Sequence, residues 1–162
     1  MRHAIAIIVA TFVAVACSGV GGPTNGDIPS RAEAEGFLDR LVTTAQAGQW
    51  DAFCGMGDGY CEARLTQIGR SSVPMASPII IDDSIIPTSP VDGGRSIGGR
   101  RLTVCGLDGS GHAYRSDVLV FRDGSSLRAI NPVYWDGTSV SSGTDPTTQP
   151  RDASPRPPAC EP

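Results

Sequence analysis

The sequence predicts an α+β domain in which N-terminal helices pack on an antiparallel sheet, with a disordered C-terminal tail. Two features of the second half predict the sheet. The segments 102–107, 114–121 and 127–135 are rich in β-branched and aromatic residues. The turns 108–111 (DGSG) and 123–124 (DG) separate them, and Asp-Gly in such a place is the strongest short-range signal of a β-hairpin. Apolar residues at helical spacing in the first half predict the helices.

The N-terminus has the pattern of a secretory signal peptide. Arg2 and His3 precede an apolar run, 4–16, which contains no acidic residue and is too short to span a bilayer comfortably. The run ends in Val-Ala-Val-Ala before Cys17, which resembles the lipobox of bacterial lipoproteins. We therefore expect removal of residues 1–16 and acylation of Cys17, with palmitate as an expected chain, on the extracytoplasmic side of the cell membrane. Ordinary secretion is the alternative, because Ala-Val-Ala also fits the rule for simple signal peptides.

The cysteine count supports an oxidising compartment. The chain has five cysteines, and if Cys17 carries lipid an even number remains for disulfide bonds. We expect Cys54 to pair with Cys61, because the glycines between them let the chain fold back. We expect Cys105 to pair with Cys160, because a cysteine so near the end of an exported chain is more often paired than free. Four cysteines allow three pairings, and the sequence alone does not choose among them.

Charge excludes some partners. The 13 basic residues are all arginine, the net charge is −4, and no basic run occurs. This balance argues against nucleic acid and against electrostatic binding to anionic lipid. Membrane attachment is therefore expected to come from the lipid anchor alone.

The first helix begins after a Gly- and Pro-rich tether, residues 17–29. Ser30 is a good N-cap, and Glu33 three positions later completes a capping box. Apolar residues then recur at spacings of one, three and four, which predicts a helix over Arg31–Ala47 that ends at Gly48.

Shorter elements follow. We predict a helical turn over 50–54, a helix over 61–68 and a first strand over 78–87, with Asp82-Asp83 forming a bulge. The glycine-rich stretch 91–99 is predicted to be a loop, and it lacks the strand-to-helix context of a phosphate-binding loop.

The strand around 117–121 is apolar on both faces, which predicts that both faces are covered. Helices account for one cover, and a second copy of the protein is a candidate for the other, so we expect a homodimer. Beyond the domain, 30–136, the composition of 137–162 is that of a disordered tail.

The order of elements, together with the segment Ala-Gly-Gln-Trp-Asp-Ala-Phe-Cys over 47–54 in the turn after the first helix, resembles the nuclear-transport-factor-two and ketosteroid-isomerase superfamily. Small actinobacterial lipoproteins with that fold are the nearest likeness. The resemblance covers residues 30–136. It implies a cone-like roll with a curved sheet, dimerisation through the sheet, and either an acidic catalytic base inside the cone or a binding or supporting role.

The candidates for chemistry are few. Asp117 is the best-placed general base, since it begins the central strand near Tyr114, whose hydroxyl is a candidate donor to an oxyanion. An aspartate at such a place more often faces solvent or pairs with an arginine such as Arg115 or Arg101. No catalytic residue of the isomerases carries over by motif. Six residues are candidates to line a small apolar pocket, although such aromatics more often form plain core: Trp50, Phe53, Tyr114, Asp117, Tyr134 and Trp135.

Other constellations have simpler interpretations. His112 with Ser110 and Asp117 offers the residue types of a triad, but residues of one hairpin rarely supply its geometry, so an exposed turn histidine is expected. Asp82 and Asp83 would point to opposite faces of a strand. The cysteines lack paired C-x-x-C spacing, so no metal and no cofactor is expected.

These observations favour a lipid-anchored extracytoplasmic binding or scaffold module of a bacterial envelope. Its expected ligand is a small apolar molecule or an envelope protein. The alternatives are a small isomerase-like or hydrolase-like enzyme that uses Asp117, and a purely structural envelope lipoprotein.

Overall fold

The computed structural model describes residues 28–88, 90–91, 94–95, 97–140 and Cys160. The predicted signal peptide, the predicted acylation site Cys17, most of the tether, and the tail over 141–159 lie outside the described residues.

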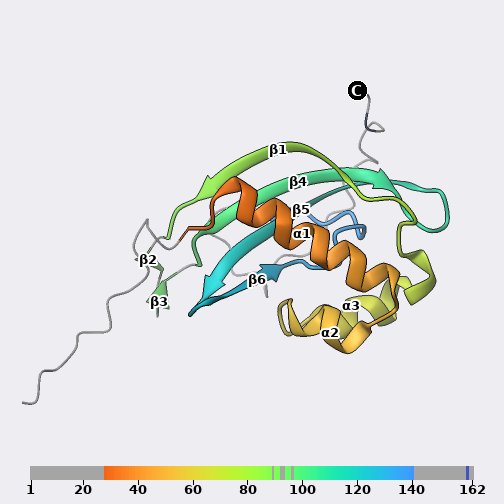
Figure 1. Cartoon of the computed structure of the whole chain (residues 1–162), viewed down its shortest axis with the longest axis horizontal. Coiled ribbons are helices and arrows are strands. Elements are labelled where there is room, and N and C mark those ends of the chain that lie inside the picture. The colour runs from red at the N-terminus through yellow and green to blue at the C-terminus, as the bar shows by residue number, and fades with distance from the viewer. Residues whose placement is uncertain (1–27, 89, 92–93, 96, 141–159, 161–162) are drawn as a thin grey trace, which may run out of the picture.

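The described chain has mixed α and β structure, as predicted. The helices are α1 (Arg31–Gln46), α2 (Trp50–Gly55) and α3 (Cys61–Ile68), followed by the short 3-10 turn η2 (Arg70–Ser72). The strands are β1 (Ile79–Ile86), β2 (Pro90–Val91), β3 (Gly94–Arg95), β4 (Gly99–Leu107), β5 (Ala113–Asp123) and β6 (Ser126–Ile130). Figure 1 shows α1 lying across one face of the sheet, with α2 and α3 at one end.

The main sheet is antiparallel throughout, in the order β1-β4-β5-β6. Its outer strand β1 carries a register shift between Ile80 and Asp82, one position before the bulge predicted at Asp82-Asp83, which themselves pair in regular register with Thr103 and Leu102. Strands β2 and β3 form a separate two-stranded ladder. The prediction that 91–99 is a loop was therefore wrong in part, because a ladder of two residues on each side leaves no periodicity to detect.

The last strand is shorter than predicted. Strand β6 ends at Ile130 and does not continue to Trp135. Asn131 has a φ of 59°, outside the range of strands, and Pro132 has no amide hydrogen to donate. Backbone conformation therefore ends the strand, although the apolar residues continue beyond it.

Helix α1 begins where the capping box predicted. The Glu33 amide donates to the Ser30 hydroxyl oxygen at 3.3 Å, and the Ser30 amide donates to the Glu33 carboxylate at 2.8 Å. The other carboxylate oxygen accepts from Arg122 of β5 at 2.5 Å. The cap thus joins the start of the helix to the sheet that the helix covers.

This cap predicts a measurable pH dependence. Hydrogen bonds from the Ser30 backbone and hydroxyl, and then from Arg122, lower the pKa of Glu33 from 4.5 to about 2. Because the folded pKa lies below the unfolded one, the cap is fully stabilising above pH 4.5 and is lost as the pH falls toward 2. We expect the NMR shift of the Ser30 amide to titrate with a midpoint near pH 2, and the Glu33→Gln variant, which keeps a cap acceptor, to lose that titration. A titration midpoint near pH 4.5 would contradict the hydrogen bonding of the Glu33 carboxylate in the cap.

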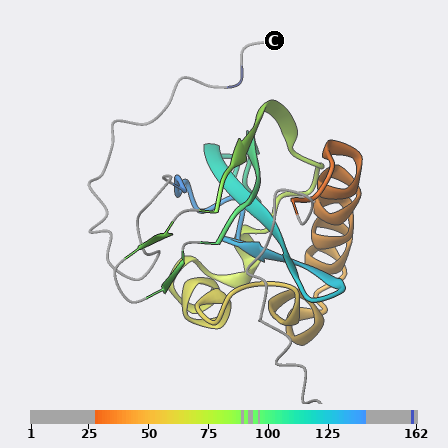
Figure 2. The same cartoon turned by 90° about the vertical axis from the view of Figure 1, so that its left-hand side faces the viewer.

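The main core lies between α1–α3 and one face of the sheet (Figure 2). Alternation along the strands decides which residues reach it, since opposite residues such as Leu102 and Val118 share a face. Its members are almost wholly removed from solvent: Ala34, Phe37, Leu38, Leu41, Val42, Ala45, Phe53, Cys61, Leu65, Leu102, Val104, Tyr114, Val118, Val120, Ala129, Val133, Tyr134 and Trp135.

The other face of the sheet holds a smaller apolar cluster. Ile86, Leu119 and Ile130 are buried there, with Phe121 and Val140 packed against them. The chain thus supplies part of the second cover of β5 itself. The homodimer stays a prediction.

Candidate functional site

The aromatic pocket candidates lie together and pack on one another. Phe53 contacts Trp50 at 6.3 Å and Trp135 at 5.8 Å between ring centroids. Trp135 contacts Tyr134 at 4.8 Å, and Tyr134 contacts Tyr114 at 6.1 Å. Four of the five are buried and Trp50 is partly buried at the margin. The rings therefore form a continuous part of the core.

The sixth pocket candidate, Asp117, is separated from these rings by the sheet. Along β5 it alternates with Ser116 and Val118, so it points to the face opposite the helices. Its carboxylate accepts from the Thr103 hydroxyl at 2.7 Å and from the Val140 amide at 3.1 Å. Both oxygens thus hold β4 and the segment after Trp135 in place, which gives Asp117 a structural role. Neither predicted arginine, Arg101 or Arg115, forms an ion pair with it among the described residues.

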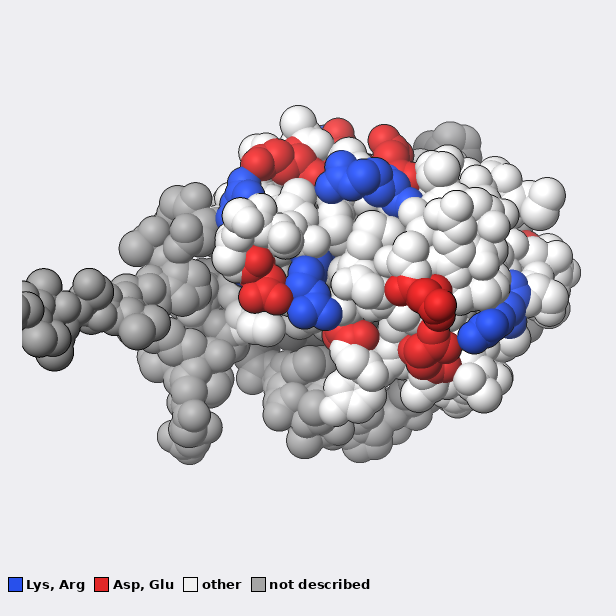
Figure 3. Space-filling model, turned by 60° about the horizontal axis from the view of Figure 1, so that its bottom comes forward, with Lys and Arg blue, Asp and Glu red and all other residues white. Residues whose placement is uncertain are grey.

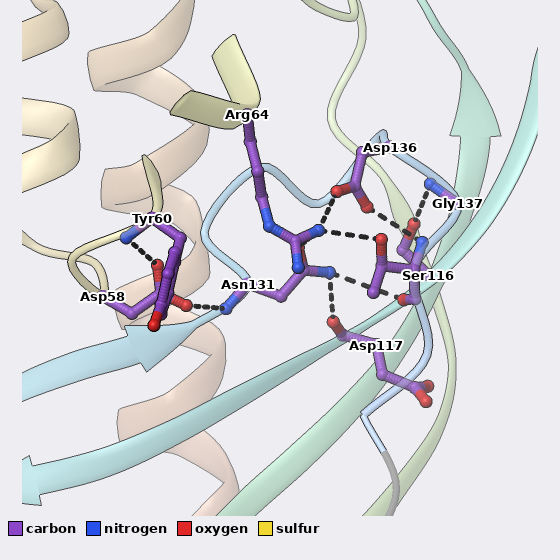
Figure 4. Close-up of polar contacts among 9 residues, drawn as sticks. Asp58, Tyr60, Arg64, Ser116, Asp117, Asn131, Asp136 and Gly137 are labelled. Atoms are coloured by element: carbon purple, nitrogen blue, oxygen red, sulfur yellow. Dashed lines mark hydrogen bonds and ion pairs between the residues drawn. The ribbon is translucent and has the colours of Figure 1, made fainter. Parts of the chain in front are cut away.

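A buried polar network lies on the helical side of β5 (Figure 4). Arg64 of α3 forms an ion pair with Asp136, whose side chain is 0% exposed, and also donates to Thr138 at 2.9 Å and to Asn131 at 3.3 Å. Asp136 in turn accepts from the Thr138 amide at 2.9 Å. One guanidinium nitrogen therefore fixes the turn that follows Trp135.

Asn131 connects that network to the sheet. Its side-chain amide donates to the Asp117 carbonyl at 2.8 Å and the Thr138 carbonyl at 3.4 Å, while its backbone amide donates to Asp58 at 3.1 Å. In Figure 4 the Asp117 carboxylate points away from Asn131, so only its carbonyl joins the network. Asparagine tolerates the positive φ at this position better than most residues do. The chemistry of this site is therefore hydrogen bonding that orders loops.

The disulfide predicted between Cys54 and Cys61 is confirmed, and its loop has a clear role. Inside the loop, the Met56 carbonyl accepts from the Ala129 amide at 2.9 Å and the Gly57 carbonyl accepts from Arg128 at 2.5 Å. A Cβ on Gly57 would come within 2.4 Å of the Pro132 side chain, so only glycine fits. The loop therefore caps the outer edge of β6.

The second predicted disulfide, Cys105–Cys160, is also confirmed. Cys105 lies opposite Arg115 in the register, on the same face as Asp117, away from the helices. This bond fixes a residue near the C-terminus to strand β4.

Two tyrosine hydroxyls are buried without a hydrogen-bond partner among the described residues, those of Tyr114 and Tyr134. The Tyr114 ring lies over Gly106, its cross-strand neighbour, where an added Cβ would come within 2.8 Å of the hydroxyl. Burial raises the pKa of both phenols above 10. Both hydroxyls are thus neutral at physiological pH, and neither provides a phenolate base.

This burial predicts an unusual response to mutation. Tyr134→Phe should raise the free energy of unfolding by about 1 kcal/mol, because it removes a desolvated hydroxyl without breaking a hydrogen bond. Urea unfolding measures the change, and Tyr60→Phe, at an exposed tyrosine, is the control with little effect. A loss of stability in Tyr134→Phe would mean that the hydroxyl has a bonding partner.

The histidine that was a candidate for a catalytic triad lies at the surface. His112 has an exposed side chain 3.5 Å from Asp108, whose carboxylate also accepts from the Ser110 and His112 amides. This arrangement orders the turn between β4 and β5, and Asp117 is not part of it. Among the described residues no group of three or more His, Cys, Asp or Glu side chains could hold a metal ion.

Strand β1 carries three exposed isoleucines. Ile79 is 59% exposed, Ile81 42% and Ile85 54%, and all three belong to the outer strand of the sheet. No hydrogen bond from another described segment reaches the free edge of β1, in contrast to the capped edge of β6. Within the described residues, the β6 edge of the sheet is therefore covered and the β1 edge is not.

The sequence predicted the disulfides but missed the network. Arg64, Asn131 and Asp136 are far apart in the chain and match no motif. The dipeptide Asn131-Pro132 is a recognised turn signal and would have pointed to the end of β6.

The charged residues on the face shown in Figure 3 alternate in sign and form no single-sign patch there.

No described helix is long and apolar enough to cross a membrane. Compared with protein-family profiles, with curated proteins and with solved structures, the chain has no significant match.

Proposed function

We propose that this chain is a lipid-anchored binding module on the extracytoplasmic side of a bacterial membrane, and that it binds a partner protein through the open edge of its sheet. The observation that carries the proposal is the presence of three exposed isoleucines on β1, Ile79, Ile81 and Ile85, at an edge that no described segment covers. Unpaired strand edges with apolar side chains pair readily with other chains, and proteins usually protect them. This domain protects β6 with a disulfide loop, whereas no segment in the described part of the chain protects β1.

The rest of the site favours a protein partner over a small ligand or a substrate. The aromatic side chains that were candidates to line a pocket contact one another in the core, and the Asp117 carboxylate accepts hydrogen bonds from Thr103 and Val140. Neither arrangement offers a base beside an apolar cavity, which the enzyme alternative requires. A binding role needs no such base.

Features of the sequence and of the fold support the proposed extracytoplasmic location and a cone-like roll. The Val-Ala-Val-Ala-Cys17 pattern supports an acylated N-terminus, and the two disulfides suit an oxidising compartment. The four-stranded sheet with helices on one face is compatible with the cone-like roll of the nuclear-transport-factor-two superfamily, and we propose that roll for this domain.

A photo-crosslinking amino acid at Ile85 tests the binding edge in cells that export the full chain. We expect a discrete adduct from Ile85, identified by mass spectrometry, and none from Asp51, an exposed position on α2. Equal adducts from both positions, or none from either, would contradict the binding edge. The anchor is tested separately by detergent phase partition, in which Cys17→Ser should move the protein to the aqueous phase.

A further inference from the structure

Strand β1 carries two neighbouring carboxylates with different surroundings. Asp83 lies opposite the core residue Leu102 and therefore points to the helical side. There it forms ion pairs with Arg100 and, at 3.5 Å, with Arg31. Its charge is thus compensated within the domain.

Asp82 points to the other face, because it lies opposite Thr103, whose hydroxyl bonds Asp117 on that face. It is exposed and forms no ion pair with any described residue. Arg101, on the same face of β4, donates to Ser84 at 3.0 Å. The open edge therefore presents one uncompensated negative charge between exposed isoleucines.

This charge disfavours a second copy as the occupant. An antiparallel pairing of two β1 strands about their centre places Asp82 or Asp83 of one copy opposite an aspartate of the other. Like charges directly opposite one another in a sheet are destabilising.

We propose that β1 binds an extended segment of a partner protein that carries an arginine or lysine opposite Asp82, flanked by apolar residues. This inference rests on the proposed function and names its partner chemistry. The added strand would pair its backbone with the free edge of β1 and pack apolar side chains beside Ile81 and Ile85. The basic residue would complement Asp82 in a cross-strand pair.

The test uses two synthetic nine-residue peptides, Thr-Val-Thr-Ile-Arg-Val-Thr-Val-Thr and its counterpart with Glu in place of Arg. They are added to the full disulfide-bonded chain, and NMR records the shifts and exchange rates of the β1 amides. We expect slowed exchange on β1 and binding of the Arg peptide about threefold tighter than the Glu peptide, as suits one cross-strand charge pair. The Asp82→Arg variant should reverse that preference, while Asp51→Arg on α2 should leave it unchanged.

Each of the other outcomes would overturn a particular part of the two proposals. Protection of β1 without regard to peptide charge would overturn the role of Asp82 and leave the binding edge intact. Absence of protection, with an adduct from Ile85 in cells, would overturn an extended partner and keep the proposed function. Absence of both would overturn both proposals. Protection of β1 that grows with protein concentration and without peptide would replace the partner by a second copy.

Discussion

Replacing Arg64 with methionine is expected to lower the free energy of unfolding by about 3–5 kcal/mol. The substitution leaves the Asp136 carboxylate inside the protein, at 0% side-chain exposure, without the guanidinium that compensates it. Removing one partner of a buried ion pair is costly because the remaining charge stays desolvated. The same change also removes donors to Asn131 and Thr138. Urea-induced unfolding followed by circular dichroism measures the difference.

Arg70→Met is the matched control for this experiment. Arg70 also pairs with an acidic residue of α3, Glu62, but both side chains are about half exposed. An exposed pair contributes about 0–1 kcal/mol. The double variant Arg64→Met with Asp136→Asn should recover part of the loss, because it removes the buried charge and keeps an acceptor for the Thr138 amide. Equal losses in Arg64→Met and Arg70→Met would refute the importance of the network.

Removing the disulfide Cys105–Cys160 by a double change to alanine is expected to cost about 4 kcal/mol. Removing Cys54–Cys61 in the same way should cost about 2.5 kcal/mol, since the entropy restored to the unfolded chain grows with the loop that a disulfide closes. The two bonds span 55 and 7 residues. Because domains of this size are stable by about 5–15 kcal/mol, either loss is a large share of the total.

The comparison of the two double variants serves as its own control, because Cys105 and Cys61 are equally buried. Denaturant midpoints under non-reducing conditions give the two losses. Mass spectrometry should confirm that each variant keeps the other disulfide. If the Cys105–Cys160 variant lost less stability than the Cys54–Cys61 variant, loop entropy would not be the dominant contribution.

Local signals predicted much of the fold. The capping box at Ser30 and Glu33 set the start of α1, and the helix over 61–68 and the hairpin turns were found from periodicity and Asp-Gly pairs. Cysteine parity and the glycines between Cys54 and Cys61 predicted the disulfides. Each of these features depends on residues that are close together in the chain or on the cysteine count, so it can be predicted from the sequence alone.

The polar network, the surroundings of Asp117 and the candidate binding edge depend on residues that are far apart in the chain. The Arg64–Asp136 pair joins residues 72 apart in the chain, and nothing near either one indicates the other. The sequence predicts Asp117 as the best-placed base because it begins the central strand near Tyr114, yet its hydrogen-bond partners come from β4 and from residue 140. The position of β1 at the edge of the sheet follows from the order of the strands, which no local signal in the sequence predicts.

The chain order of these contacts sets a condition on how the domain can assemble after synthesis. The start of α1 is held by Arg100 and Arg122, which lie 71 and 89 residues downstream of their partners Pro29 and Glu33. A chain that is threaded through a translocation channel N-terminus first delivers its three helices before the strands on which they pack. The helices then lack the complete sheet until β6 has emerged, and Arg64 meets the Asp136 carboxylate only after residue 136 follows. If the chain is exported as proposed, its tertiary structure is therefore completed only after residues up to 136 have left the channel.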